Sequence, residues 1–325
     1  MRSASYYSQL PNHKVRCELC PNYCIIEEGE IAPCRSRQNI DGTLIAVNYG
    51  KTCSLSIDPI EKKPLYHYYP GSNILSLGPN SCNLHCEFCQ NFEISQNESH
   101  TTFISPEELL SLCLERRIES VAFTYSEPFT WFEYLLDAGK LLHKSGIRIV
   151  LVTNGYINQE PLLELLPYID AMNIDLKAFS NNFYQDVCQG SLKPILETIK
   201  TATRHCHIEL THLLIPDHND DNKQFTELVD FIANLDNEIP LHIARYFPRY
   251  KLQESPTSLE LMHEFFNLAK QSLKHVYLGN VPEDSITYCS NCGTTLISRS
   301  LTRIKTNYLD KGICPKCQTA LRGRF

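Results

Sequence analysis

Fifteen cysteines are the most constraining feature of this chain of 325 residues, because eleven of them lie in three tight groups. The groups are Cys17, Cys20, Cys24 and Cys34; Cys82, Cys86 and Cys89; and Cys289, Cys292, Cys314 and Cys317. The N-terminal stretch lacks the apolar segment of a secretory signal, so we expect a cytoplasmic protein whose thiols stay reduced. The spacing therefore predicts metal-binding thiolates and argues against a disulfide framework.

The composition limits the classes of protein and partner. Hydrophobic residues make up 42% of the chain, which suits one large α/β domain with small appendages. The 30 Lys and Arg residues against 37 Asp and Glu leave a formal charge of −7, and basic residues cluster only near the C-terminus. We therefore expect no strong nucleic-acid binding. No run of about 18 apolar residues occurs, so the sequence predicts no contact with a membrane interior.

From residue 73 onward, short apolar runs alternate with longer amphipathic stretches. The expected strands are 73–79, 120–125, 147–153, 171–177, 208–215, 240–246 and 275–281. The expected helices are 105–117, 127–146, 159–166, 193–204, 221–235 and 257–273. This alternation predicts an α/β fold with a parallel sheet. Six βα repeats favour an open or partial (β/α)6 barrel of the TIM type over a flat doubly wound sheet.

Helix-capping and turn residues refine the boundaries of these elements. Ser105 with Glu108 three residues later predicts a capping box, and Gly146 predicts a left-handed helix end. Asp41-Gly42 predicts a hairpin in the N-terminal segment. We divide the chain into a cysteine-rich lobe at 1–72, a barrel at 73–282 and a small cysteine-rich module at 283–325.

Cys82, Cys86 and Cys89 form a CxxxCxxC run directly after the first expected strand, where (β/α) folds carry their active sites. Iron–sulfur clusters and structural zinc ions usually take four ligands, so three thiolates leave one coordination position open. An open iron is a catalytic feature. The alternative is a zinc loop whose fourth cysteine comes from elsewhere in the chain.

The run and its flanking motifs resemble the radical S-adenosylmethionine (SAM) enzymes. Phe88 precedes the third cysteine, and Gln90-Asn91 follow it as in the activating-enzyme branch of that family. Further motifs are similar to the AmmeMemoRadiSam system subgroup, which itself resembles pyruvate formate-lyase activating enzymes. These motifs are Asp58 to His67, Pro70-Gly71-Ser72 and Gly279-Asn280-Val281.

The resemblance implies a radical SAM barrel with a [4Fe–4S] cluster on Cys82, Cys86 and Cys89, and with SAM on the fourth iron. It implies reductive cleavage of SAM to methionine and a 5′-deoxyadenosyl radical, with flavodoxin or ferredoxin as the electron donor. The radical would abstract hydrogen from a protein, as in glycyl-radical activation, or from a small molecule. A third reading is a non-catalytic metal-ribbon adaptor, which would have a closed four-ligand site.

Two motifs after the second and third expected strands also carry over. Tyr125-Ser126-Glu127-Pro128 stands where the family has Gly-Gly-Glu-Pro, whose glutamate and backbone hold the methionine amino group of SAM. The resemblance assigns this role to Glu127, and the alternative is a cap of the following helix. Thr153-Asn154-Gly155 is similar to the family's Asp-Thr-Asn-Gly, with Val152 in place of the aspartate. The resemblance assigns Asn154 to the SAM site.

Charged residues in two later strands complete the expected site. Asp175-Leu176-Lys177 matches the Asp-Leu-Lys of activating enzymes, and a charged pair in an apolar strand favours a pocket over the core. Arg245 would hold the carboxylate of methionine or a substrate anion. His242 is assigned to the same site, with a hydrogen-bonded core histidine as the alternative.

The two flanking cysteine groups predict two further metal sites. Cys289-Ser-Asn-Cys292 and Cys314-Pro-Lys-Cys317 are CxxC knuckles at the spacing of a zinc ribbon, with a second iron–sulfur cluster as the alternative. Cys17, Cys20, Cys24 and Cys34 fit either zinc or an auxiliary [4Fe–4S] cluster. We favour zinc there, because a lobe without a core needs a structural metal.

Overall fold

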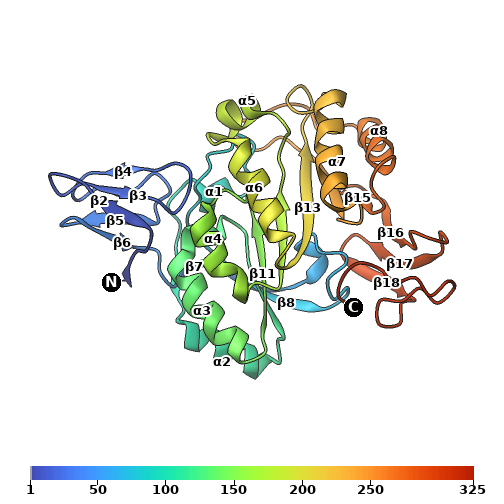
Figure 1. The fold of residues 1–325 in the computed structure, drawn as a ribbon, viewed down its shortest axis with the longest axis horizontal. Helices are drawn as coiled ribbons and strands as arrows, with labels where there is room; N and C mark the ends of the chain where they lie inside the picture. The colour runs from blue at the N-terminus through green and yellow to red at the C-terminus, as the bar shows by residue number, and fades with distance from the viewer. Residues whose placement is uncertain (1) are drawn as a thin grey trace.

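Seven parallel strands form the centre of the structure, which is a computed structural model that describes residues 2–325 (Figure 1). The sheet order is β15-β14-β13-β12-β11-β10-β8-β7-β9. The strands are β7 (Lys51–Pro59), β8 (Asn73–Pro79), β9 (Thr102–Phe103), β10 (Ser120–Phe123), β11 (Arg148–Thr153), β12 (Ala171–Asp175), β13 (His207–Leu214), β14 (Leu241–Arg245) and β15 (Val276–Gly279). Each parallel strand pairs with its neighbour in the chain, so the sheet winds in one direction, as in a partial barrel. The predicted α/β class is confirmed.

Amphipathic helices follow most of these strands. The longer ones are α2 (Pro106–Arg116), α3 (Phe132–Lys144), α4 (Gln159–Leu165), α6 (Leu192–Ala202), α7 (Asn222–Asp236) and α8 (Leu259–Lys270). The short ones are η1 (Ile60–Lys62), α1 (Phe92–Ser95), η2 (Pro128–Trp131), η3 (Leu166–Tyr168), α5 (Asn181–Phe183) and η4 (Tyr184–Cys188). Their buried side chains, with those of the sheet, form one large apolar core.

The predicted helix signals are present. The Ser105 hydroxyl accepts the Glu108 N–H at 3.1 Å, and the Glu108 carboxylate accepts the Ser105 N–H at 2.7 Å. Gly146 follows α3 with a φ of 75°, the left-handed conformation that glycine adopts without steric cost. The helix expected over 127–146 begins only at Phe132, because Pro128 to Trp131 form a separate 3₁₀ turn.

The N-terminal lobe, residues 2–50, contains two small antiparallel sheets. Their strands are β1 (Arg2–Ser3), β2 (Tyr7–Gln9), β3 (Val15–Cys17), β4 (Ile25–Ile26), β5 (Arg37–Ile40) and β6 (Thr43–Ala46). The β5–β6 pair turns at Asp41-Gly42, as predicted. Arg37 ties the lobe to the barrel, because its guanidinium lies 3.0 Å from the carboxylate of Glu133 on α3 and both side chains are buried.

Residues 51–72 belong structurally to the main sheet. β7 pairs with β8 in antiparallel register, with Ile57 opposite Leu75. The segment after β7 then crosses the edge of the barrel, where the N–H groups of Tyr66 and His67 donate to the Glu209 carboxylate at 2.9 and 2.7 Å. The sequence boundary at residue 72 thus falls inside this edge, and the described N-terminal lobe ends near residue 50.

The C-terminal ribbon, residues 283–325, is an antiparallel sheet at the opposite end of the long axis from the N-terminal lobe (Figure 1). Its strands are β16 (Asp284–Tyr288), β17 (Thr295–Ser300) and β18 (Arg303–Asn307). Arg299 is fully buried and donates to the Tyr66 carbonyl at 2.6 Å. A ring nitrogen of His67 lies 2.8 Å from the carbonyl oxygen of Arg322. The ribbon is therefore docked on the barrel by buried polar contacts.

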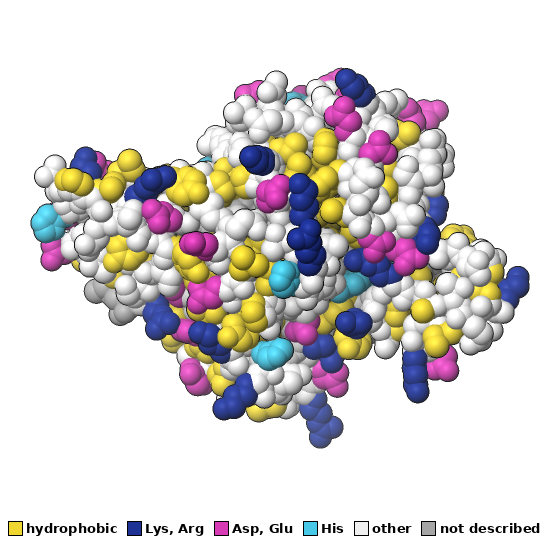
Figure 2. Space-filling view, viewed as in Figure 1, with side chains coloured by type: hydrophobic (Ala, Val, Ile, Leu, Met, Phe, Trp, Pro, Cys, Tyr) yellow, Lys and Arg dark blue, Asp and Glu magenta, His cyan; other side chains and the backbone are white. Residues whose placement is uncertain are grey.

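No helix between residues 2 and 325 is long and apolar enough to cross a membrane. On the face shown in Figure 2, Lys and Arg side chains alternate with Asp and Glu side chains and form no broad basic patch.

Candidate functional site

A cavity of about 1000 Å³, here called the barrel cavity, lies at the carboxyl ends of the parallel strands. Its wall includes every residue that the sequence assigned to the radical SAM site. These residues are Cys82, Cys86, Cys89, Glu127, Asn154, Asp175, Lys177, His242 and Arg245. They come together because loops at the same edge of a parallel sheet face one another.

The cysteine loop, residues 80–91, connects β8 to α1 and has no regular structure of its own. The N–H groups of His85 and Glu87 donate to the carbonyls of Cys188 and Val187 at 2.9 and 3.0 Å. The Asn83 amide donates to the Tyr156 carbonyl at 2.6 Å. These bonds hold an irregular loop in one conformation, which a site with several ligands requires.

The three thiols of the loop differ in their surroundings. Cys86 is buried beside Cys188, and their hydrogen bond together with burial raises the pKa of Cys86. Burial also raises the pKa of Cys82 and of Cys89. The free thiols are therefore protonated at neutral pH, so metal binding must release their protons.

Cys188 is the nearest candidate for a fourth ligand of a closed zinc loop. It lies against Cys86 but takes no part in the wall of the barrel cavity. Within residues 2–325, no set of three or more ligand atoms that includes the loop sulfurs lies mutually within 4.8 Å. A tetrahedral zinc ion with Zn–S bonds of ~2.3 Å holds its sulfurs about 3.8 Å apart. The geometry thus favours an open multi-iron site over a closed zinc loop.

Glu127 is a buried carboxylate with three protein donors. One oxygen accepts the Phe129 N–H at 3.0 Å and the Thr153 hydroxyl at 2.7 Å. The other accepts the Asn154 N–H at 2.8 Å. Burial raises the pKa of Glu127 to about 7, against the opposing effect of these bonds. The bond to Phe129 caps the following 3₁₀ helix, as the capping alternative expected. Glu127 also lies on the cavity wall, so the two roles are compatible.

Asn154 links Glu127 to the cysteine loop. Its side-chain N–H donates to the Asn83 side chain at 3.0 Å and lies 3.8 Å from the Cys82 sulfur. Its side-chain oxygen accepts the Tyr156 N–H at 2.8 Å. Asn154 thus holds the loop against the end of β11.

Tyr125 replaces a glycine of the related motif and still adopts the backbone conformation that glycine favours, with a φ of 71°. Its hydroxyl donates to Asp58 at 2.9 Å, and the Lys63 ammonium lies over its ring. The close backbone approach at this point comes from Gly78, where an added Cβ would lie 1.9 Å from the Thr124 carbonyl oxygen. Gly78 on the neighbouring strand therefore permits the close packing of the Thr124 carbonyl.

Asp175 and Lys177 form an ion pair of 2.7 Å at the end of β12. Burial opposes the charged form of the lysine, but Asp175 and the thiols of Cys86 and Cys188 outweigh it and raise the pKa of Lys177. Lys177 is therefore a cation beside the cysteine loop, and the prediction that this pair lines a pocket agrees with its position.

His242 reaches the cavity wall but has a structural partner. Its Nε2 lies 2.7 Å from the carboxylate of Glu209, a buried residue that also contacts His207 at 3.0 Å. Burial raises the pKa of Glu209, but its histidine partners outweigh this effect and hold the pKa well below its usual range. At its Nε2 atom, His242 is therefore a hydrogen-bonded core histidine, and it also contributes to the cavity wall.

Arg245 contributes to the cavity wall, and its guanidinium carbon lies 4.9 Å from the centre of the Phe247 ring, which also belongs to the wall. Its Nε donates to the Thr257 carbonyl at 2.6 Å, which orients the group. In the described part of the chain, its two terminal nitrogens have no protein acceptor within hydrogen-bond distance. Two free donors in a fixed plane suit a carboxylate.

Sequence reasoning missed an ionic group from the edge segment after β7. Asp58 lies 2.9 Å from Lys63 and 3.2 Å from Lys62, and it accepts the Tyr125 hydroxyl. Burial would raise the pKa of Asp58, but these donors lower it to about 2. Burial lowers the pKa of Lys63, against the effect of Asp58. The only sequence signal was the motif from Asp58 to His67, which was assigned no site role.

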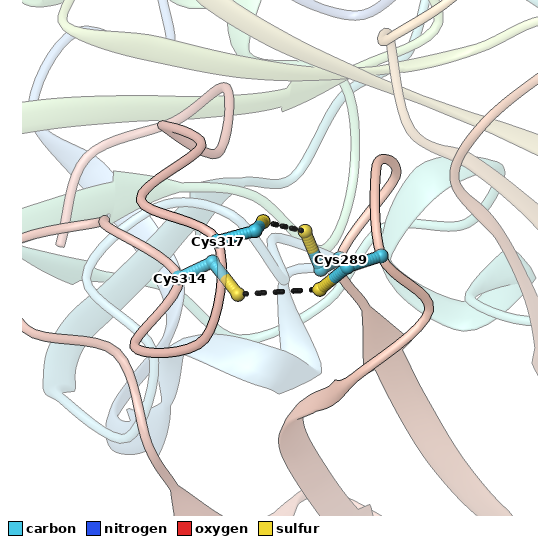
Figure 3. Close-up of side chains that lie close together, drawn as sticks. Cys289, Cys314 and Cys317 are labelled. Atoms are coloured by element: carbon cyan, nitrogen blue, oxygen red, sulfur yellow. Dashed lines mark hydrogen bonds between the residues drawn. The ribbon is translucent and has the colours of Figure 1, made fainter.

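The four ribbon cysteines meet at the spacing of a single ion (Figure 3). The sulfurs of Cys289 and Cys317 lie 3.5 Å apart, and those of Cys292 and Cys314 lie 3.7 Å apart. All four lie within 4.8 Å of one another. These distances are close to the ~3.8 Å of tetrahedral zinc. Hydrogen bonds with Thr319 lower the pKa of Cys317 to about 5, which favours the metal-binding thiolate.

The donor set and the space of the barrel cavity fit the [4Fe–4S] cluster and SAM. Three thiols stand on one loop, and a cavity of about 1000 Å³ adjoins them. The same wall carries the free guanidinium donors of Arg245 and the buried carboxylate of Glu127. A small-molecule site has these features: concave, of this size, and with few convergent polar groups.

Comparisons with known proteins give one matching family profile and several similar chains. The profile of the Radical SAM superfamily matches residues 78–232, which include the cysteine loop, Glu127, Asn154, Asp175 and Lys177. The uncharacterized protein MJ0808 of Methanocaldococcus jannaschii is 43% identical over 319 residues, covering 95% of each chain. The 4-hydroxyphenylacetate decarboxylase activating enzyme of Clostridium scatologenes is 28% identical over 115 residues, covering 34% of this chain and 37% of that enzyme. A crystal structure of a domain of pyruvate-formate lyase-activating enzyme from Bacteroides vulgatus superposes with a TM-score of 0.43 at 21% identity, covering 49% of this chain and 98% of that one.

Proposed function

We propose that this chain, whose residues 78–232 match the Radical SAM superfamily, is an activating-type enzyme that uses SAM-derived radical chemistry to modify a protein. The observation that carries the proposal is the convergence of three cysteine thiols, Glu127 and Arg245 on one cavity of about 1000 Å³. The activating enzyme of Clostridium scatologenes supports the choice of a protein substrate. Membership of the AmmeMemoRadiSam subgroup stays a prediction.

Cys82, Cys86 and Cys89 would hold the cluster, and SAM would fill the adjoining space. When bound, the reduced cluster and SAM supply a carbon-centred radical that abstracts a hydrogen atom from the substrate. A flavodoxin or ferredoxin is the proposed electron donor.

The residues of the chain then bind and orient. Arg245 has two free donors for the methionine carboxylate, because its Nε is already occupied by Thr257. Glu127 has one acceptor position left after its three protein bonds, which suits the methionine ammonium. Lys177 places a positive charge beside Cys86, which favours the thiolate form of that ligand.

The ribbon has a separate proposed role. Its four sulfurs leave no open coordination position, so we propose that it binds a structural zinc ion. Leu301 and Thr302, in the turn between β17 and β18, form part of the wall of the barrel cavity. The ribbon therefore limits how a substrate enters, and we expect it to contribute to substrate choice.

Anaerobic incubation with SAM and dithionite tests the proposed chemistry. Reconstituted wild-type protein is expected to form 5′-deoxyadenosine, measured by mass spectrometry, and the variant with Cys82, Cys86 and Cys89 all changed to Ala is expected to form none. Cys206→Ala is the matched control, because Cys206 lies outside the wall of this cavity. Product formation by the triple variant would refute the assignment.

The same reaction with candidate partners tests the substrate class. A mass change or a glycyl radical signal in a protein partner supports the activating-type proposal. Turnover of a small molecule without a protein partner would favour the alternative of a small-molecule enzyme. Absence of iron from the anaerobically reconstituted protein would favour the metal-ribbon adaptor.

A further inference from the structure

The N-terminal lobe contains a second cavity, here called the lobe cavity, of about 310 Å³. All four N-terminal cysteines contribute to its wall, namely Cys17, Cys20, Cys24 and Cys34. Cys17 ends β3, Cys20 and Cys24 follow in the next loop, and Cys34 precedes β5. The N–H of Cys17 donates to the Cys24 carbonyl at 2.9 Å, which brings the two ends of that loop together.

No three of these sulfurs converge to within 4.8 Å of one another, as the ligands of one metal ion would. Among residues 2–325, the sulfurs of the four ribbon cysteines lie mutually within 4.8 Å. No such set includes the N-terminal sulfurs. One zinc ion would hold four sulfurs about 3.8 Å apart. The lobe cavity also has about ten times the ~30 Å³ that one water molecule occupies in the liquid. The site thus fits a group larger than a single ion.

The donor chemistry narrows the choice of that group. Four thiols and no carboxylate contribute to the wall, and a thiolate set of this kind selects zinc, copper(I) or iron–sulfur clusters. A [4Fe–4S] cluster binds each thiolate to a different iron, which requires the wider spacing.

A buried cation faces the same cavity. Arg37 is fully buried, contributes to the wall of the lobe cavity, and has an Nε without a hydrogen-bond partner among residues 2–325. Its Nη2 lies 3.0 Å from the Glu133 carboxylate, and its Nη1 donates to the Ser36 carbonyl at 3.3 Å. A buried donor with no acceptor is costly, and an anionic group in the cavity would supply one.

The cysteine loop separates the two cavities. Cys82, Leu84 and Cys86 contribute to the wall of the barrel cavity. Asn83 and His85, which alternate with them, contribute to the wall of the lobe cavity. Consecutive Cα atoms lie about 3.8 Å apart, so a group in one cavity lies within a few side-chain lengths of a group in the other.

Two lobe residues fasten this dividing loop. The Asn22 side chain donates to the Asn83 carbonyl at 2.8 Å. The Arg35 guanidinium donates to the carbonyls of Asn80 and Ser95, both at 3.1 Å. The lobe therefore packs directly on the loop that carries the proposed radical site.

We propose that Cys17, Cys20, Cys24 and Cys34 bind a second [4Fe–4S] cluster, separated from the barrel cavity by the cysteine loop. This assignment replaces the zinc ion that the sequence favoured for the lobe. It does not depend on the function proposed for the barrel cavity, because its ligands and its cavity are separate.

Iron and sulfide analysis of the full-length protein after anaerobic reconstitution tests the proposal. We expect about eight irons per chain in the wild type and about four in the variant with Cys82, Cys86 and Cys89 changed to Ala, which leaves the lobe ligands intact. Cys206→Ala is the matched control and should retain about eight. Loss of all iron from the triple variant, with a second zinc ion per chain in the wild type, would overturn the proposal.

Electron paramagnetic resonance tests the placement. In the dithionite-reduced wild type, two adjacent clusters should give a broadened, spin-coupled signal, and the triple variant should give the simple signal of one isolated cluster. A variant with Cys20 and Cys34 changed to Ser should give only the simple signal of the cluster bound by Cys82, Cys86 and Cys89. A wild-type spectrum that equals the sum of two uncoupled signals would overturn the adjacency.

The radical chemistry and the second cluster can be refuted separately. If the wild type forms 5′-deoxyadenosine and the triple variant contains no iron, only the second cluster is refuted. About four irons in the triple variant, with no 5′-deoxyadenosine from the wild type, would refute the radical chemistry alone.

Discussion

The N-terminal lobe and the C-terminal ribbon each bring four cysteines together, but at different spacings. In the ribbon the four sulfurs lie within 4.8 Å of one another. In the lobe four sulfurs surround a cavity of about 310 Å³. The number and type of ligand are the same, so the difference must come from the backbone that carries them.

The ribbon builds its site from two matching turns. The N–H of Gly293 donates to the Cys289 carbonyl at 3.0 Å, and the N–H of Gln318 donates to the Cys314 carbonyl at the same distance. The turns face each other because the β17–β18 hairpin brings them together. The lobe has one irregular loop and a separate residue, Cys34, and its ligands therefore surround a larger volume.

The two appendages are docked on the barrel in similar ways. Arg37 of the lobe lies 3.0 Å from Glu133, and Arg299 of the ribbon lies 3.9 Å from Glu61. All four side chains are buried. Loss of the closer Arg37–Glu133 pair should therefore lower the free energy of unfolding more than loss of the Arg299–Glu61 pair.

The largest expected effect comes from removing one ribbon ligand. Cys314→Ser should abolish zinc binding and unfold residues 283–325, because structural zinc contributes an apparent ~10–16 kcal/mol to small metal-dependent folds. Zinc analysis and hydrogen exchange of β16, β17 and β18 check this outcome. Cys206→Ser is the control and should keep its zinc. Loss of about four irons instead of one zinc would show that the ribbon also holds a cluster.

The next effect concerns the docking of the lobe. Arg37→Met leaves the Glu133 carboxylate buried without its cation and should lower the free energy of unfolding by about 3–5 kcal/mol. Urea unfolding measures this loss. Arg2→Met removes an exposed pair with Asp137 and should cost at most about 1 kcal/mol. Equal effects of the two variants would contradict a specific docking role for Arg37.

The corresponding change in the ribbon should cost less. Arg299→Met removes buried hydrogen bonds to the Tyr66 carbonyl and the Thr287 hydroxyl, and it should lower the free energy of unfolding by about 1.5–3 kcal/mol. Urea unfolding again provides the measurement, with the exposed Arg303→Met as the control. A loss larger than that of Arg37→Met would reverse the comparison between the two docking arginines.

The smallest expected effect is a pH dependence that His275 contributes on the ribbon side of the barrel. Burial lowers the pKa of His275 to about 4, and its ring lies 4.5 Å from that of His67, which contacts Arg322. Its neutral form stabilises the fold above pH 6.5, and this contribution falls as the pH drops toward 4. At pH 5 the loss should be about 2 kcal/mol.

Urea unfolding of the wild type and of His275→Gln at pH 7 and pH 5 isolates this contribution. The variant should lose about 2 kcal/mol less stability between the two pH values. The one histidine of the N-terminal lobe, His13, has an exposed side chain and provides the control variant His13→Gln. An unchanged pH dependence in His275→Gln would contradict the role of the buried ring.

Local patterns were sufficient for the secondary structure of the barrel. The strand expected over 73–79 coincides with β8, and the capping box at Ser105 forms as predicted. Hydrophobic periodicity and caps depend on residues within a few positions of one another, so they are readable without the fold. The start of α3 was placed too early, because Pro128 to Trp131 form a separate 3₁₀ turn that the Glu127 side chain caps.

Part of the candidate site followed from the same reasoning. The family resemblance assigned Glu127, Asn154 and Lys177 to the site, and all three lie on the wall of the barrel cavity with the cysteine loop, because loops at the carboxyl ends of parallel strands share one edge. The Asp58–Lys63 pair, Glu209 and Cys188 were missed. Asp58 also accepts from Tyr125, Glu209 accepts from the Tyr66 and His67 N–H groups, and Cys188 contacts Cys86. These partners lie far away in the sequence, so no local pattern reveals them.

The sequence by itself determined the strand and helix order, the three cysteine groups and the ligand chemistry, because these depend on residue type and short spacing. Only the tertiary structure decided how far apart the thiols stand and which cavities they share. Two CxxC turns on a hairpin converge on the volume of one ion, whereas Cys17, Cys20, Cys24 and Cys34 surround a larger space beside the cysteine loop. That distance depends on how the intervening backbone packs against the barrel, and identical ligands can therefore hold different metals.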